Sequence, residues 1–181
     1  MGDRTRFVAL LERIQNASRL SGGETGSGPG WSRLGSEYSD PLRVVVAFPE
    51  AYEIGISNQA IQILYHLARE TAGVGVERCY LPWVEAISLM RAEGLYLPTL
   101  ETWSPVKDAH LVGITLQHEL NYTNVLELLH LAGIPVRASQ RSAFPLVIAG
   151  GPAVSNFLPM EPFSMRWWWG MGRKFSRRFW K

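Results

Sequence analysis

Three short runs of almost uninterrupted apolar residues constrain the fold of this chain more than any other feature. They are Leu42-Arg43-Val44-Val45-Val46-Ala47-Phe48, Leu111-Val112-Gly113-Ile114-Thr115-Leu116 and Leu146-Val147-Ile148-Ala149. A strand with one solvated face alternates apolar and polar residues, whereas a strand buried on both faces does not. The three runs are therefore predicted to be strands of a parallel sheet.

Helical patterns alternate with these strands. We predict a helix at Phe7–Ile14, one capped by Ser57 or Asn58, one at Trp83–Ala92 that Gly94 ends, and one from a cap at Asn121 or Thr123 to about Leu131. Shorter strands are expected at Val76–Leu81 and Ile134–Val136. The alternation predicts an α/β fold, a Rossmann-like three-layer α/β/α architecture with a doubly wound, mostly parallel open sheet.

The chain has 181 residues, and no apolar run is long enough to span a bilayer. Its start mixes charged and apolar residues, unlike a signal peptide. The single cysteine, Cys79, excludes an intrachain disulfide and a multi-cysteine metal site. We therefore expect a cytoplasmic protein without a membrane partner, divided into an amino-terminal helix and Gly/Ser-rich linker (1–40), a Rossmann-type domain (41–163) and a tail (164–181).

The tail is unusual in composition. It holds six of the 18 Lys and Arg residues and no acidic residue, which leaves 12 basic against 16 acidic residues in the body, so the body indicates no nucleic-acid partner. Four of the seven tryptophans lie in the last 15 residues. Such a tail could bind a membrane surface or nucleic acid.

A slip of the reading frame explains more features of the tail than a binding role does. Because Trp and Met each have one codon, moving the frame by one base converts the Trp run into V-V-G-x-G, and the free bases then allow an acidic, amphipathic helix start. That is the next strand-turn-helix unit of the fold. We predict a frame slip near Phe163 or Ser164, which reading the gene there would test.

In an open α/β sheet, ligands bind beyond the carboxyl ends of the strands, near the point where strand order reverses. The segments that follow the three apolar strands are richer in polar residues or glycine than a bare connection requires. Candidate cofactor-binding residues in them are Pro49, Glu50, Tyr52, Gly55, Ser57, Asn58, Gln117, His118, Glu119, Asn121, Thr123, Gly150, Gly151 and Pro152.

The glycines would let a ligand approach the backbone, and the helix starts near Ser57 and Asn121 would suit an anion such as phosphate. The alternative stays open that Gly150-Gly151-Pro152 is only a turn and that the polar residues are only caps. No catalytic residue and no metal site are expected: His118-Glu119 lacks the second histidine of a zinc-protease motif. Glu50 and Glu53 are expected to be solvated, and Cys79 to be buried.

These segments resemble one known family. Val44 to Ser57 is similar to the "AFPDxYEVGMS" opening of B12-binding-type radical SAM proteins, and Arg19 to Glu24 to their "RYIGGE". Further segments are similar to "LQILY" (61–65), "ERVFAPW" (77–83), "GFSLQYELTYTN" (113–124) and "IAGGP" (148–152), and the shifted tail restores "VVGDGEE". The resemblance covers nearly the whole chain.

The resemblance implies a cobalamin-binding-like domain in front of a radical SAM barrel, its packing partner. That barrel would hold a 4Fe-4S cluster on Cys-x3-Cys-x2-Cys and cleave S-adenosylmethionine, so this chain alone is not expected to be an enzyme. The Asp-x-His-x-x-Gly motif that supplies the lower cobalt ligand is absent, and residues 57–60 offer no imidazole.

Three readings stay open. The chain is an accessory binding domain of a radical SAM enzyme, a stand-alone module that binds a cobamide or nucleotide, or a truncated product that does not fold stably.

Overall fold

The computed structural model describes residues 3–20, 41–141, 143–163 and 166–168. Its strands are β1 (Leu42–Phe48), β2 (Val74–Tyr80), β3 (Leu111–Thr115), β4 (Leu146–Gly150) and β5 (Arg166–Trp168). Its α-helices are α1 (Asp3–Leu11), α3 (Tyr52–Gly55), α4 (Gln59–Arg69), α5 (Val84–Glu93) and α6 (Asn121–Leu131). Short 3₁₀ turns complete it: η1 (Ala17–Arg19), η2 (Val106–Asp108), η3 (Ala138–Gln140), η4 (Pro152–Asn156) and η5 (Leu158–Phe163).

The strands form one five-stranded sheet in the order β2-β1-β3-β4-β5, and every neighbouring pair is parallel. The predicted doubly wound, parallel α/β fold is confirmed. The order reverses between β1 and β3, because the chain first moves outward to β2 and then returns to the other side of β1. This reversal is the point where open α/β sheets bind ligands at their carboxyl edge.

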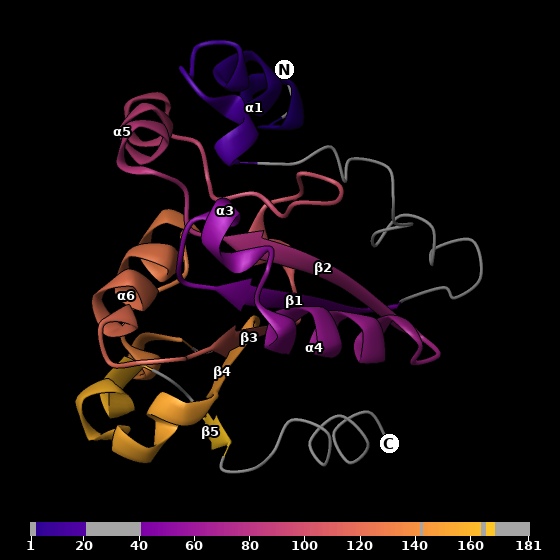
Figure 1. Ribbon diagram of the computed structural model, residues 1–181, viewed down its shortest axis with the longest axis vertical. Helices are drawn as coiled ribbons and strands as arrows, with labels where there is room; N and C mark the ends of the chain where they lie inside the picture. Colours follow the sequence, from indigo (N-terminus) through magenta and orange to yellow (C-terminus); the bar gives the residue numbers. More distant parts are fainter. Residues whose placement is uncertain (1–2, 21–40, 142, 164–165, 169–181) are drawn as a thin grey trace.

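Two apolar clusters occupy the two faces of the sheet. Val44 and Val46 of β1 pack with Ile61 and Ala68 of α4 on one face. Val45 of β1 belongs to the other cluster, which also contains Met90 of α5, Leu128 of α6 and Leu10 of α1. Figure 1 shows α4 on one side of the sheet and α5 and α6 on the other. The apolar run in β1 therefore reflects burial on both faces, as predicted.

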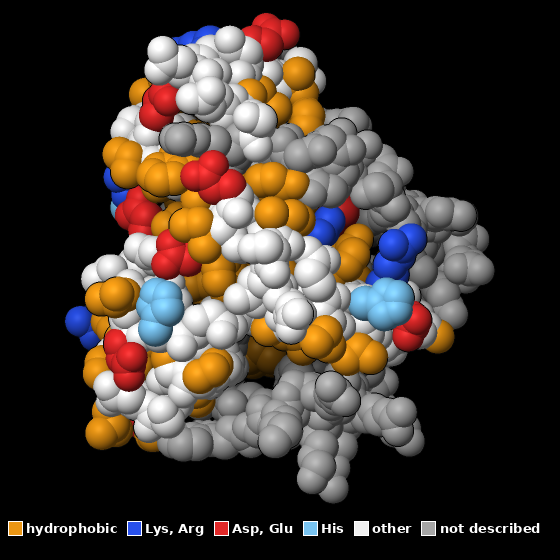
Figure 2. All heavy atoms as spheres, viewed as in Figure 1, with side chains coloured by type: hydrophobic (Ala, Val, Ile, Leu, Met, Phe, Trp, Pro, Cys, Tyr) orange, Lys and Arg blue, Asp and Glu red, His pale blue; other side chains and the backbone are white. Residues whose placement is uncertain are grey.

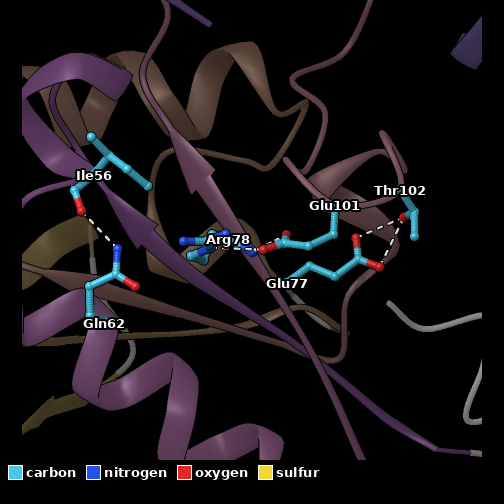
Figure 3. Close-up of polar contacts among 6 residues, drawn as sticks. All are labelled: Ile56, Gln62, Glu77, Arg78, Glu101 and Thr102. Carbon is cyan, nitrogen blue, oxygen red and sulfur yellow. Dashed lines mark hydrogen bonds and ion pairs between the residues drawn. The ribbon is translucent and has the colours of Figure 1, made fainter. Parts of the chain in front are cut away.

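Strand β2 lies at an edge of the sheet, yet all seven of its residues are buried. The segment after α5 covers this edge. Leu100 N donates to Arg78 O (2.8 Å), and the Glu101 carboxylate accepts from Arg78 N (2.7 Å) and Nε (2.8 Å). Thr102 Oγ1 donates to the Glu77 carboxylate, with distances of 2.9 and 2.8 Å to its two oxygens (Figure 3). The covering segment satisfies backbone groups that an open edge would offer to another chain.

Several local predictions need correction. The first helix is Asp3–Leu11 rather than Phe7–Ile14. Ile134–Val136 is not a strand, since Ile134 N donates to Leu129 O (2.9 Å) and ends α6 while the Ile134 side chain enters the core. The second strand is Val74–Tyr80, two residues before its predicted start.

Two predicted regions fall mainly outside the described residues, namely the Gly/Ser-rich linker at 21–39 and the tail. Residues 166–168 of the tail form β5 in the frame given, so the sheet extends beyond β4 without any shift of frame. The frame slip stays a prediction.

Candidate functional site

The described strands β1 to β4 end almost level with one another. Phe48 lies opposite Tyr80, Ala47 opposite Ile114, and Thr115 opposite Gly150. Because the strands are parallel, the segments that follow them emerge from one edge of the sheet, which we call the carboxyl edge. The three candidate segments are therefore neighbours, as predicted.

Hydrogen bonds join the first two segments across the strand-order reversal. Asn121 Nδ2 donates to Glu50 Oε1 (2.5 Å), and Asn124 Nδ2 donates to Pro49 O (2.9 Å). Leu81 N, which follows β2, donates to Glu50 O (3.0 Å). Glu50 is therefore half-buried and hydrogen-bonded, whereas we expected a solvated carboxylate. The polar groups at the point where the strand order reverses are thus hydrogen-bonded to one another.

Asn121 does not cap α6, contrary to the prediction. Leu120 occupies the N-cap position without a side-chain cap, and the first turn is closed by Asn121 N to His118 O (3.1 Å) and Tyr122 N to Glu119 O (3.0 Å). The Asn121 side chain is fully buried instead, and its Oδ1 has no hydrogen-bond partner within the described residues. Thr123, the other predicted cap, is exposed in α6.

The first segment uses its candidate residues for local structure. Tyr52 is buried and packs edge-on against Tyr80, with ring centroids 5.5 Å apart. A Cβ on Gly55 would lie 2.5 Å from the Tyr80 ring, so the glycine makes room for that ring. Ser57 Oγ donates to Ile54 O (3.2 Å), and Asn58 Oδ1 caps α4 by accepting from Ala60 N (3.0 Å), which confirms one of the two predicted caps.

The third segment is folded against the second. Leu116 N donates to Gly150 O (2.7 Å), and Ala153 N donates to Leu116 O (3.3 Å). Gly151 has φ +120°, and a Cβ there would overlap the Leu116 carbonyl. The absence of a side chain at Gly151 therefore permits a close approach to the Leu116 carbonyl, and the approach of a ligand there stays a prediction. Pro152 then begins η4.

Tyr122 completes the link between these segments, because its hydroxyl hydrogen-bonds to Ala153 O (3.0 Å) and Asn156 O (2.6 Å). Gln117 is half-buried, whereas His118 and Glu119 are exposed at the same edge. The structure thus brings the candidate residues together and gives most of them structural partners. Whether any of them contacts a ligand stays a prediction.

A pocket lies beside this edge, between the end of β2, α1 and the segment that covers β2. Its walls are mainly apolar and aromatic: Phe7, Leu11, Leu20, Tyr52, Tyr80, Leu81, Pro82, Leu97, Pro98, Thr99, Leu100 and Trp103. The cavity volume of about 30 Å³ has room for a few water molecules but not for a nucleotide or a cobamide.

Sequence reasoning missed four apolar side chains at the carboxyl edge. Ile54 is 51% exposed, Val84 73% and Leu120 83%, and Trp83 is also exposed. Each stands a few residues after the end of a strand, in a segment that reads as an ordinary connection. No local pattern distinguishes them, because an apolar residue beside a helix start is usually a core residue.

Cys79 is buried, as predicted, and burial is the main cause that raises the pKa of its thiol, with the Glu101 charge adding to it. Among the described residues, no three His, Cys, Asp or Glu side chains gather as a metal site would require. Within the same residues, no helix combines the length and apolar character needed to cross a membrane.

Comparison with known proteins gives one family. The family described as radical SAM proteins, N-terminal, matches residues 60–178, about two thirds of the chain. No curated protein and no solved structure matches. The matched region runs from α4 through β4 and into the tail, and so contains the second and third segments of the carboxyl edge. The chain therefore belongs to the radical SAM protein family, as an amino-terminal part of such a protein.

Proposed function

We propose that this chain is the accessory amino-terminal domain of a radical SAM iron–sulfur enzyme and that the catalytic part is encoded beyond it. The observation that carries the proposal is the family match over residues 60–178. In the three-layer α/β/α body, the carboxyl edge of the sheet is the place where such folds bind ligands.

The chain's own residues do not fit the cluster chemistry. A Cys-x3-Cys-x2-Cys motif needs three thiolates, and the sequence contains one cysteine. The Cys79 thiol is buried in the core with a raised pKa, which disfavours the thiolate that binds iron. The iron–sulfur cluster and S-adenosylmethionine are thus assigned to the catalytic part, where the cluster would supply the electron for reductive cleavage.

The residues present do not fit cobalamin either. The loop that would supply a lower ligand reads Ser57-Asn58-Gln59-Ala60, without an imidazole. Its Ser57 hydroxyl and Asn58 amide are already bonded to the backbone. The reversal point is closed by the Glu50–Asn121 contact, and the neighbouring pocket is small. We therefore assign the domain a role in assembly with the catalytic part rather than one in carrying a cobamide.

The composition of the tail supports a continuation of this protein in another frame. The experiment is to sequence the gene across codons 160 to 181 and to search downstream for the cysteine motif. The protein made from the repaired gene, after cluster reconstitution, is expected to cleave S-adenosylmethionine under reducing conditions. An intact frame without a downstream cysteine motif would contradict the proposal. A saturable absorbance change of hydroxocobalamin on titration with the purified chain would instead support the stand-alone cobamide module.

A further inference from the structure

Three segments of the carboxyl edge carry charge of one sign. The segments that follow β1, β2 and β3 (residues 49–58, 81–85 and 116–122) contain four glutamates, Glu50, Glu53, Glu85 and Glu119, and neither Lys nor Arg. The same segments contain one histidine, His118. On the flanks of the same helices the signs are mixed: Arg91 of α5 pairs with Glu127 of α6 (2.7 Å).

Exposed apolar side chains lie among these acids. We call Ile54, Trp83, Val84 and Leu120, together with the four glutamates, the rim surface. The Arg91–Glu127 pair places α5 and α6 side by side, and both begin at the carboxyl edge, so Val84 and Leu120 stand at the starts of neighbouring helices. Figure 2 shows orange and red side chains interspersed over the region of α3, α5 and α6.

We propose that the rim surface docks onto a basic face of the iron–sulfur part of the same protein, with Ile54, Val84 and Leu120 entering apolar recesses between its Lys and Arg side chains. The inference rests on the proposed function and names the surface through which the two parts assemble. Apolar side chains at the centre of an interface supply the contact energy, and the surrounding charges select the partner and its orientation.

The charge of the rim surface argues against two other occupants. A second copy would bring the same four glutamates opposite these ones, because a two-fold interface pairs a patch with itself. A phosphate-bearing ligand would meet the same negative potential without a Lys or Arg in these segments to hold it. A basic protein surface meets both the charge and the apolar side chains.

The test compares variants of the full-length protein that carries this chain at its amino terminus. Val84→Lys and Leu120→Lys place a positive charge in the rim surface, where it would face the Lys and Arg side chains of the partner, and both positions are exposed, so the domain itself should fold normally. Ile63→Lys is the matched control: Ile63 is 44% exposed, but it lies on α4, which packs on the opposite face of the sheet from α5 and α6. The first readout is protease release of the amino-terminal domain, and the second is hydrogen exchange at residues 49–58, 81–85 and 116–122.

We expect the rim variants to be released about tenfold faster or more, because one tenfold step is about 1.4 kcal/mol of lost interface energy, whereas the control is unchanged. Exchange at the three segments should be slower in the full-length protein than in the isolated chain. Unchanged release in both rim variants, or equal exchange, overturns the docking surface. A shift of the isolated chain to dimers that Leu120→Glu abolishes would also overturn it, in favour of a second copy. If the full-length protein still cleaves S-adenosylmethionine, the proposed function survives either result.

Discussion

The Arg78–Glu101 ion pair is almost completely buried, and it holds the covering segment against β2. Burial alone would lower the pKa of Arg78, but the hydrogen bond and charge of Glu101 raise it overall. Burial raises the pKa of Glu101, and the bonds and charge of Arg78 only partly offset this. The Arg78 guanidinium also lies over the Tyr65 ring, 4.5 Å from its centroid. Each charge therefore depends on the other to remain inside the protein.

We predict that Arg78→Met lowers the free energy of unfolding by about 3–5 kcal/mol at pH 7, because it leaves the Glu101 carboxylate buried without its cation. The remaining influences on Glu101, burial and the Glu77 charge, both raise its pKa. An acid whose pKa is higher in the folded than in the unfolded state stabilises the fold below its unfolded pKa, and this stability is lost as the pH rises through the folded pKa. The stability of the variant should thus fall more steeply with rising pH than that of the parent chain.

Urea unfolding at pH 5 and pH 8 measures this slope. The double variant Arg78→Met/Glu101→Leu removes both charges, so it should lose the additional slope and recover part of the stability, while the Arg78 backbone N–H loses its Glu101 acceptor. Equal slopes in Arg78→Met and in the double variant would show that Glu101 is not the group that titrates.

Helix α4 is held at its start by a single cap. Asn58 Oδ1 accepts from the backbone N–H groups of Ala60 (3.0 Å) and Ile61 (3.4 Å). Gln62 Nε2 donates to Ile56 O (2.7 Å) in the turn before the helix (Figure 3).

Asn58→Ala is expected to destabilise the chain by about 1 kcal/mol, because two N–H groups of the first turn lose their acceptor. Ser57→Ala is the matched control: Ser57 is exposed and bonds only to Ile54 O among the described contacts, so its effect should stay within about 0.5 kcal/mol. The urea midpoint of Asn58→Ala should be clearly lower than that of Ser57→Ala. Equal losses of stability in the two variants would mean that Asn58 is not the cap.

The elements that sequence predicted best are those with a local signal. Val44 to Phe48 is apolar on both faces, so its strand was predicted at the observed bounds, and Asn58 precedes α4 with the spacing of a cap. Asn121 was assigned wrongly because its partner, Glu50, lies 71 residues away, and no local pattern records that contact. The four-residue helix α3 is too short to show a period. No local pattern shows that Glu77 and Arg78 of β2 are buried, because the segment that buries them follows a whole helix later.

The candidate site also combines features that the sequence predicts with features that only the structure shows. Parallel strands bring their carboxyl ends to one edge whatever their side chains, so the grouping of the three segments follows from the strand pattern alone. What the side chains do there depends on tertiary packing. Gly151 faces the Leu116 carbonyl, and Leu120 is exposed at the start of α6 rather than buried. Sequence therefore located the edge, and only the structure distinguished its internal contacts from its outward-facing surface.

At the scale of the whole molecule, the question is whether the α/β body is stable without the catalytic part. Both faces of the sheet are covered, and the segment after α5 covers the outer edge of β2. At the other side of the sheet, β5 extends it beyond β4. Strands β1 and β3 each have a neighbour on both sides, and β1 lies against both apolar clusters. Separating either strand would expose both faces of the core, so the body should open as one cooperative unit.

Hydrogen exchange of the purified chain tests this expectation. The amides of β1 and β3 should be the slowest to exchange, with protection of at least about 10³, since a domain of ordinary stability unfolds with a free energy of about 5 kcal/mol or more. Amides at the exposed start of α6 and in η4 should exchange much faster, because they can open without separating the strands. Uniformly fast exchange would mean that the 181-residue chain does not fold alone. In that case the covering segment and β5 do not compensate for the missing partner, and the truncated-product reading would replace the accessory domain.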